Sequence, residues 1–380
     1  MEILQYTHNH LKFRQKVQAF VKKEITPYAD QWEQDKVVPR SLWKRMGEEG
    51  LLCTTIAPEY GGQGHDFLYS VIVAEELSRS NNDGLGPVTH SDIVVPYIDS
   101  FACEQVKKKY LPGCIAGDLI TAIAITESGA GSDAAAIETT AVEDGNEIII
   151  NGSKIFITNG LNCDLAVVSA RDPSVKDTHK AISIYLVEAT RPGFKKGKKL
   201  EKMGLNSQDT AELFFTDCRI PKQNLLGQKG KGFYLLMNKL QQERLVVSLF
   251  AVSFAEYILE QTIDFFKNNY GSGKPYPKAQ SIQFTLVELS TLVKIGRTFL
   301  DMLIANHIEG NNVVVETSMA KYWTSDMVWK VVNECIEIYG DMGMYESCPI
   351  VKCMRDVRVM QIFAGTTEVM KSIIGKFMKL

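Results

Sequence analysis

Length, composition and charge exclude several classes of protein. The chain has 380 residues, 45% of them apolar and 23% charged, with a formal net charge of −3. This composition is typical of a globular protein and excludes global disorder or low complexity. Because the net charge is close to zero, nucleic acid and anionic membranes are not expected partners. The length predicts two or three packed substructures rather than a single core.

The first residues and the cysteines indicate the compartment. Residues 1–10 lack a basic segment followed by an apolar one, so no signal peptide is expected. No apolar run approaches the ~20 residues of a membrane helix. The eight cysteines are scattered, and none forms a CxxC pair. We therefore expect reduced, mostly buried thiols, no metal site and a cytoplasmic protein.

Helical periodicity dominates the first part of the chain. Apolar residues recur at helical spacing between Phe13 and Tyr28, and again between Val71 and Leu77. The glycine-rich segment 58–64 (PEYGGQG) marks a break between helical stretches. These patterns predict an N-terminal helical domain over residues 1–118.

The pattern changes to strands over residues 119–230. β-branched and aromatic residues are frequent in five segments that predict strands: 137–142, 147–158, 166–170, 181–187 and 211–215. Asp144-Gly145 and Asn151-Gly152 are typical of tight turns between such strands. We expect a central antiparallel β domain.

Helical texture returns over residues 231–380. Glycine-rich breaks at 271–275 and 339–343 separate the long helices of this region. The chain therefore predicts an α+β fold with helices first, then a β domain, then a C-terminal helical bundle.

Two segments carry the most specific pattern. The segment 126–133 (TESGAGSD) is a glycine-rich loop, which exposes backbone N–H groups to an anionic or polar ring edge. Thr126 and Ser132 add side-chain donors to it. A predicted β hairpin follows this loop, and the segment 151–160 (NGSKIFITNG) forms the end of that hairpin. The loop alone is typical of a surface turn, but the hairpin at this distance favours a binding site.

Together the two segments resemble the flavin-contacting signatures of the acyl-CoA dehydrogenase family. The resemblance covers essentially the whole chain and is closest to the long-chain and isovaleryl branches. It continues through 202–204, 209–212, 224–227, 355–356 and 365–366. It implies a helical domain, an antiparallel β-barrel and a four-helix bundle, assembled as a homotetramer. It also implies FAD as cofactor, an acyl-CoA substrate and an electron-transfer flavoprotein as partner.

The resemblance assigns individual residues to cofactor and substrate. It implies that Thr126 and Thr158 contact the flavin ring and that Phe156 packs on it. Ser132 is placed on the CoA side, and Arg244 near the CoA arm. The other positions implied are Ile125, Gly131 and Thr366 for the cofactor and Gly365 for the substrate.

The catalytic base is identified from a departure in the sequence. The reaction needs a base at the substrate α-carbon and fixed donors for the thioester oxygen, because negative charge develops there. Many family members carry the base directly before the late Gly-Thr, where this chain has Ala364. The backbone N–H of Ala364 remains as the thioester donor. The long-chain and isovaleryl branches place the base on an earlier helix, in a pattern similar to 241–245 (QQERL), which implies Glu243.

Helical spacing around Glu243 supports this assignment. All five neighbours on its face of the helix are apolar: Leu236, Leu240, Val246, Val247 and Phe250. A carboxylate among them is desolvated, which raises its pKa toward that of a useful base. The alternative is a buried glutamate in a salt bridge with a core arginine.

Asp92 is a second candidate base. It lies in the segment 89–96 (THSDIVVP), which by resemblance borders the acyl pocket. Alicyclic acyl-CoA dehydrogenases place an aspartate in the equivalent region as a base at a ring carbon. The alternative is a helix N-cap or a polar wall of the pocket. The acyl group therefore stays open between branched, long-chain and alicyclic.

The cofactor-binding edge also departs from the family pattern. Asn269 stands where the family usually carries an arginine, and Glu337 and Gly340-Asp341 stand where it shows Gln and Gly-Gly. The resemblance implies that these positions hold the FAD pyrophosphate and adenine across a subunit interface. One positive charge is lost and two negative charges are gained, which predicts weaker retention of FAD.

Two other functions are compatible with these departures. One is a flavin-poor relative that performs acyl-CoA hydration or another proton transfer with Glu243 and Asp92. The other is an inactive partner subunit of a heteromeric dehydrogenase. A yellow colour on purification distinguishes a flavin dehydrogenase from both.

Overall fold

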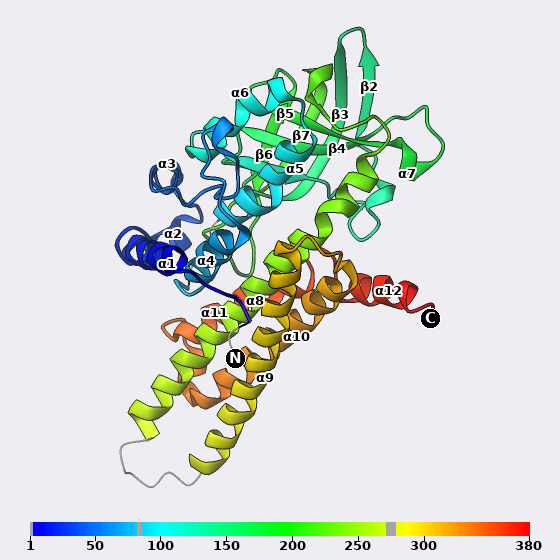
Figure 1. The fold of residues 1–380 in the computed structure, drawn as a ribbon. Coiled ribbons are helices and arrows are strands. Elements are labelled where there is room, and N and C mark those ends of the chain that lie inside the picture. Colours follow the sequence, from blue (N-terminus) through cyan, green and yellow to red (C-terminus); the bar gives the residue numbers. More distant parts are fainter. Residues whose placement is uncertain (1–2, 82–85, 271–278) are drawn as a thin grey trace.

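The helix, sheet and helix order expected from the sequence is confirmed. A computed structural model describes residues 3–81, 86–270 and 279–380. N-terminal helices pack beside a twisted sheet, and long C-terminal helices extend away from both (Figure 1). The helix break predicted at 271–275 lies outside the described residues.

The N-terminal region is a set of short helices. Its elements are α1 (His8–Phe20), η1 (Val21–Ile25), η2 (Thr26–Tyr28), α2 (Ala29–Asp35), α3 (Arg40–Glu48), η3 (Pro58–Tyr60), α4 (Phe67–Ser78), η4 (Thr89–Val94), α5 (Val95–Phe101) and α6 (Glu104–Ile115). Asp66 caps α4, because its carboxylate accepts the backbone N–H of Leu68 at 2.9 Å. Nearly every side chain of α4 is buried, so this helix forms the centre of the region.

The π-helical turn η4 joins the three regions. It continues directly into α5, with Pro96 in the first turn of that helix. The turn packs on the long helix α8 and also on strand β1 of the sheet. Residues on η4 therefore lie between the sheet and the bundle.

The central region is one eight-stranded sheet, with the order β6-β7-β3-β2-β4-β5-β8 and β1 paired to β4. The strands are β1 (Thr121–Ala124), β2 (Thr140–Asp144), β3 (Glu147–Thr158), β4 (Leu165–Arg171), β5 (Ile182–Glu188), β6 (Phe194–Lys199), β7 (Thr210–Pro221) and β8 (Leu225–Leu226). The short elements η5 (Ala134–Ala136), α7 (Thr178–Ala181) and η6 (Lys222–Asn224) connect them.

The sheet is not the closed antiparallel barrel that the resemblance implied. Its two end strands, β6 and β8, are not paired with each other in the described structure. Strand β1 runs parallel to β4, and β2 meets β4 through one parallel bridge. The edge strand β6 has the sequence FKKGKK, and lysines are a common protection of an exposed sheet edge.

One of the two predicted turns is confirmed and the other is wrong. Asp144 pairs with Glu147 across the β2–β3 hairpin, with Gly145 at φ 60°. Strand β3 runs straight through Asn151-Gly152, where the pairing with β7 shifts register. Gly152 adopts φ 147° there, and a Cβ would lie within 3 Å of Thr139. The Asn-Gly pair therefore serves a bulge and a close strand approach rather than a reversal.

The C-terminal region is built on three long helices. Its elements are α8 (Gly232–Tyr270), α9 (Ala279–Ile308), α10 (Val314–Ile338), η7 (Gly340–Met344), α11 (Pro349–Val357), η8 (Arg358–Gln361) and α12 (Thr367–Phe377). The predicted break at 339–343 is confirmed, because α10 ends at Ile338. Helix α8 is long and apolar enough to cross a membrane, but most of its apolar window is buried inside the protein, as in the core helix of a bundle.

One apolar core runs through both helical regions. Ile72 of α4, Phe254 of α8 and Val328 of α10 are fully buried members of the same cluster. The inner face of the sheet forms a separate cluster that includes Ile150 and Val168. The N-terminal helices and the bundle therefore fold against each other.

A buried ion network links the same two regions. Arg297 of α9 donates to Glu75 of α4 at 2.7 Å and to Glu256 of α8 at 2.8 Å. Arg14 of α1 donates to the other oxygen of Glu75 at 2.7 Å and to Glu76 at 2.8 Å. The charges of α1, α4, α8 and α9 are paired with one another, so removing one of them would leave a buried partner uncompensated.

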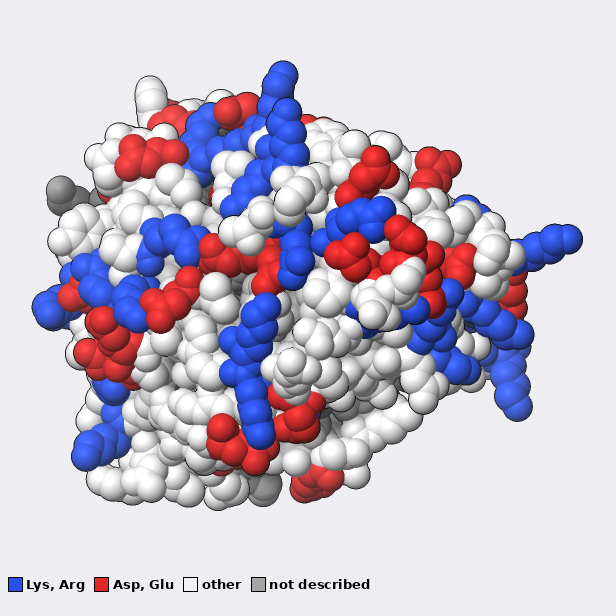
Figure 2. All heavy atoms as spheres, turned by 90° about the horizontal axis from the view of Figure 1, so that it is seen from above, with Lys and Arg blue, Asp and Glu red and all other residues white. Residues whose placement is uncertain are grey.

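Charges and thiols are distributed without a concentrated site. Seven of the eight cysteines are buried and Cys103 is exposed. Basic and acidic side chains are interspersed over the face shown in Figure 2. Among the residues that the structure describes, no group of three or more His, Cys, Asp and Glu side chains is placed to hold a metal ion.

Candidate active site

The two signature segments meet at a bulge in strand β3. The N–H of Ile155 donates to the carbonyl of Thr126 at 2.9 Å, so the glycine-rich loop adds to the strand. The pairing of β3 with β7 shifts register between Lys154 and Ile157. Phe156 lies inside this shift with φ 61°, and 64% of its surface is exposed. The bulge therefore turns an aromatic ring outward beside the loop.

A buried ion pair supports this surface from below. The ammonium group of Lys154 donates to Glu127 at 2.7 Å and to the Ile125 carbonyl at 2.9 Å. The Glu127 carboxylate also accepts the N–H groups of Glu138 and Thr139. Burial lowers the pKa of Lys154 to about 8. The pair thus ties strand β3 to both ends of the glycine-rich loop.

The arrangement fits a planar, polar ring. Thr126 and Thr158 are half-buried, and Gly131 and Ser132 are exposed on the loop. The backbone bond from Ile155 to Thr126 places the start of the loop next to strand β3, close in the chain to Phe156 and Thr158. The residues predicted for the flavin ring thus come from two segments that pair through their backbones, and their contact with a flavin stays a prediction.

Glu243 is buried, as its helical neighbours predicted. It lies on α8 with 8% of its surface exposed. The hydroxyl of Tyr97, from α5, donates to its Oε1 at 2.7 Å. Burial raises the pKa of Glu243, and the Tyr97 hydrogen bond and the charges of Arg244 and Lys239 partly oppose this. Its Oε2 accepts no hydrogen bond within the described part of the chain, so that oxygen is available to take a proton.

The alternative of a salt-bridged core glutamate does not apply. No described arginine lies in ion-pair contact with Glu243, whose partner is the Tyr97 hydroxyl. Arg244 is itself buried and donates from Nη1 to Ser318 of α10 at 2.9 Å. Its buried Nε has no acceptor among the described residues. An unsatisfied buried donor of this kind is suited to a ligand oxygen.

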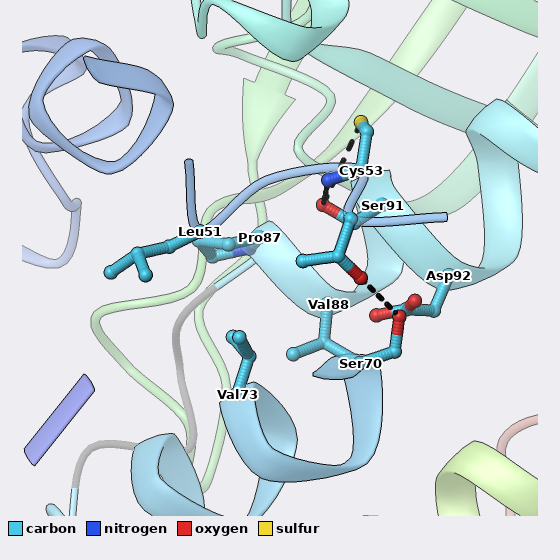
Figure 3. Close-up of a pocket in the computed structure, with 9 residues that line it drawn as sticks. Leu51, Cys53, Ser70, Val73, Pro87, Val88, Ser91 and Asp92 are labelled. Atoms are coloured by element: carbon cyan, nitrogen blue, oxygen red, sulfur yellow. Dashed lines mark hydrogen bonds between the residues drawn. The ribbon is translucent and has the colours of Figure 1, made fainter. Parts of the chain in front are cut away.

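Asp92 lines a small pocket next to Ser70, with Leu51 and Val88 on other walls (Figure 3). Ser70 in turn hydrogen bonds with Thr54 at 2.9 Å. Burial raises the pKa of Asp92 to about 7. This environment is compatible with a base and with a polar pocket wall, so the role of Asp92 stays a prediction.

Asp92 and Glu243 lie on adjacent elements. The backbone carbonyl of Asp92 accepts the side-chain amide of Gln242 at 2.7 Å, which fixes η4 against α8. The two carboxylates form no shared hydrogen bond in the described structure. The structure therefore brings the two candidate bases into one region without pairing them.

The late Gly-Thr segment forms a strained turn against α10. Ala364 adopts φ 52°, a conformation that costs an L-residue about 1–2 kcal/mol, and Gly365 adopts φ 94°. The carbonyl of Gly365 accepts the ammonium group of Lys321. Thr366 caps α12 by accepting the N–H of Val369 at 3.2 Å. The N–H of Ala364 donates no hydrogen bond to any described residue and is free for a ligand.

The predicted pyrophosphate edge lies at the far ends of α8 and α10. Asn269, Glu337, Gly340 and Asp341 are all exposed. The side chain of Asn269 donates back to the Phe265 carbonyl at 2.8 Å, within its own helix. The roles of these four residues toward FAD stay a prediction.

Sequence reasoning missed three groups of this region. Tyr97 gave no local signal, because its partner Glu243 is 146 positions away. Lys154 did give one, since it has the same strand parity as the buried Ile148 and Ile150. The third group is Lys321 of α10, which donates to the Gly365 carbonyl.

The Tyr97 hydroxyl is expected to set the pH range of proton transfer. A hydrogen bond to a charged group contributes about 1.5–3 kcal/mol, which corresponds to roughly one to two pH units. The Tyr97 bond favours the charged carboxylate, so Tyr97→Phe raises the pKa of Glu243 further. In the flavin dehydrogenation expected from the sequence, the rise of the reaction rate with pH should therefore move to higher pH, which stopped-flow measurements across pH will show. An unmoved profile would contradict the assignment; Tyr110→Phe, which removes a distant buried hydroxyl, is the control.

Three family models match the chain. They are the N-terminal domain of acyl-CoA dehydrogenase over residues 7–118, the middle domain over 122–218 and the C-terminal domain over 230–379. Together the matches span the helical, sheet and bundle regions.

Individual relatives agree with the models. The mitochondrial long-chain specific acyl-CoA dehydrogenase of Rattus norvegicus is 41% identical over 98% of this chain and 86% of its own length. A crystal structure of acyl-CoA dehydrogenase from Geobacillus kaustophilus has a TM-score of 0.96 and 47% identity, covering 99% of both chains. A structure described as the electron transferring flavoprotein of Acidaminococcus fermentans has a TM-score of 0.93 and 33% identity, covering 99% of both chains. The chain belongs to the acyl-CoA dehydrogenase family.

Proposed function

We propose that this acyl-CoA dehydrogenase is an FAD enzyme that forms the α,β double bond of an acyl-CoA, with Glu243 as its base. The observation that carries the proposal is the buried Glu243 carboxylate with one oxygen bound to Tyr97 and the other free. Ala364 leaves no carboxylate at the position where many family members carry one, so Glu243 is the acid of this region suited to the α-proton.

The chain's own residues account for the proton half of the reaction. Glu243 Oε2 accepts the α-proton, and Tyr97 holds Oε1 throughout. The free N–H of Ala364 donates to the thioester oxygen as negative charge grows there. Bound FAD would supply the acceptor for the β-hydride, while Glu243 takes the α-proton as the Cα=Cβ bond forms.

The residues present fit the ring of FAD better than its phosphates. Thr126, Thr158 and Phe156 offer a surface of hydroxyls and an exposed ring. At the other end Asn269 supplies no charge to a pyrophosphate. We therefore expect FAD to be bound through its ring and lost more readily than is usual in the family.

The substrate and partners follow from the resemblance. A long-chain acyl-CoA is the first substrate to test, since the rat relative is long-chain specific by name; branched and alicyclic acyl groups are the alternatives. Ser132 is proposed to lie on the CoA side, Arg244 near the CoA arm and Gly365 in contact with the substrate. An electron-transfer flavoprotein as acceptor, a homotetramer and a cytoplasmic location complete the proposal.

The test is bleaching of the bound flavin by substrate. The protein, purified in excess FAD, is expected to be yellow and to lose its flavin absorbance on mixing with a long-chain, branched or alicyclic acyl-CoA without added acceptor. A protein that stays colourless would favour the flavin-poor hydratase, if it hydrates an enoyl-CoA, or the inactive subunit, if it does not.

A further inference from the structure

Lys321 is a fully buried lysine that has no assigned role in the proposed dehydrogenation. It lies on α10 with 0% of its surface exposed. Within the described residues its ammonium group forms no ion pair, and its hydrogen-bond acceptor is the carbonyl of Gly365. Burying an ammonium group without a carboxylate is costly, and burial lowers the pKa of Lys321 to about 8. The role of Lys321 is therefore sought in the segment that contains its acceptor, the Gly365 carbonyl.

Its acceptor belongs to the strained turn. Ala364 and Gly365 both have positive φ, and such a conformation persists at a non-glycine residue when its surroundings hold it in place. Side chains of α10 provide that support. Their contacts are Lys321 to the Gly365 carbonyl, Ser325 to the Met360 carbonyl at 3.0 Å, and Asp326 accepting the Gln361 amide at 2.7 Å.

The supported turn carries the free donor of the site. The N–H of Ala364 makes no hydrogen bond inside the described structure. The same face of α10 bears Ser318, three residues before Lys321, and Ser318 binds Arg244 next to the base. One face of α10 thus holds both the neighbour of Glu243 and the turn that contains Ala364.

We propose that Lys321 is a positioning residue for the dehydrogenation: its ammonium group fixes the Ala364–Gly365 turn so that the Ala364 N–H meets the thioester oxygen. This inference rests on the proposed function. Lys321 contacts neither substrate nor cofactor; it acts through the Gly365 carbonyl. A donor that is already in place before charge develops is more effective than one that must reorient.

The variant that tests this is Lys321→Met, which keeps the length of the stem and removes the donor. The limiting rate of flavin reduction should fall about 10²–10³-fold, the loss typical of one misplaced oxyanion donor. The dissociation constant of the substrate should change much less, because the interaction strengthens as the transition state is reached.

A spectroscopic signal separates positioning from general damage. The absorption of an α,β-unsaturated acyl-CoA moves to longer wavelength when its carbonyl is polarised. Bound to Lys321→Met, the same ligand should absorb closer to its position in free solution than when bound to the wild type. Lys330→Met is the matched control, since Lys330 is an exposed lysine of the same helix; it should match the wild type in rate and spectrum.

The outcomes are distinguishable. A Lys321→Met protein with wild-type rate and spectrum would overturn this inference alone, while a wild type that no acyl-CoA bleaches would overturn the proposed function with it. If Lys321→Met does not fold, Lys321→Gln is judged by the same two measurements, with the same direction of change expected.

Discussion

Replacing Glu243 with glutamine is expected to slow reduction of the flavin by substrate about 10²–10⁴-fold, the usual cost of losing a general base. Glutamine keeps the shape of the side chain, and its amide oxygen still accepts the Tyr97 hydroxyl. It has no lone pair basic enough for the α-proton. Binding of substrate should be nearly unchanged, so the loss lies in the chemical step and is measured by rapid mixing under anaerobic conditions.

Asp92→Asn is the matched control for this result. Asp92 is buried, and burial raises its pKa to about 7, so it resembles a candidate base by environment alone. With an open-chain substrate the variant should reduce flavin at nearly the wild-type rate. If Asp92→Asn is slow and Glu243→Gln is not, the base is Asp92, and an alicyclic substrate becomes the leading choice.

The second large effect is expected at Lys154. Lys154→Met leaves the Glu127 carboxylate buried without its counter-charge, which typically costs 3–5 kcal/mol. Two backbone N–H groups still bind Glu127, so about 3 kcal/mol is expected. The Ile125 carbonyl also loses its donor, which loosens the loop that we propose binds the flavin ring. Both a lower denaturant midpoint and faster loss of FAD should follow.

The double variant Lys154→Met with Glu127→Gln tests the cause. Removing both charges avoids the isolated carboxylate, so most of the stability should return, while FAD release stays fast because the Ile125 contact is still missing. Equal destabilisation in the single and double variants would show that packing of the lysine stem, rather than charge, explains the loss.

The order of the regions and the burial of Glu243 were predictable because they depend on local periodicity. Apolar residues three, four and seven positions from Glu243 lie on the same face of the helix. They predict that this face, and Glu243 with it, is buried, whatever the tertiary contacts are. The β2–β3 hairpin was predictable for the same reason, since its Asp-Gly signal lies within four residues.

Features set by distant contacts were not predictable. Asn151-Gly152 has the composition of a turn, but pairing with β7 and the closeness of Thr139 keep it in a strand. Strand β6 was missed because FKKGKK lacks apolar alternation and owes its conformation to its neighbour β7. The open sheet likewise depends on which strands meet, and a resemblance to a barrel fold did not reveal it.

The apolar core shared by the N-terminal helices and the bundle has a consequence for how such a protein is assembled in a cell. The N-terminal helices leave the ribosome with an apolar surface whose partner, α8, is synthesised more than a hundred residues later. Glu75, which pairs with Arg14, likewise meets Arg297 only after α9 has been synthesised. During synthesis, the N-terminal third of the chain therefore exposes apolar surface that chaperones can bind. Folding is completed only after the C-terminal third has been synthesised.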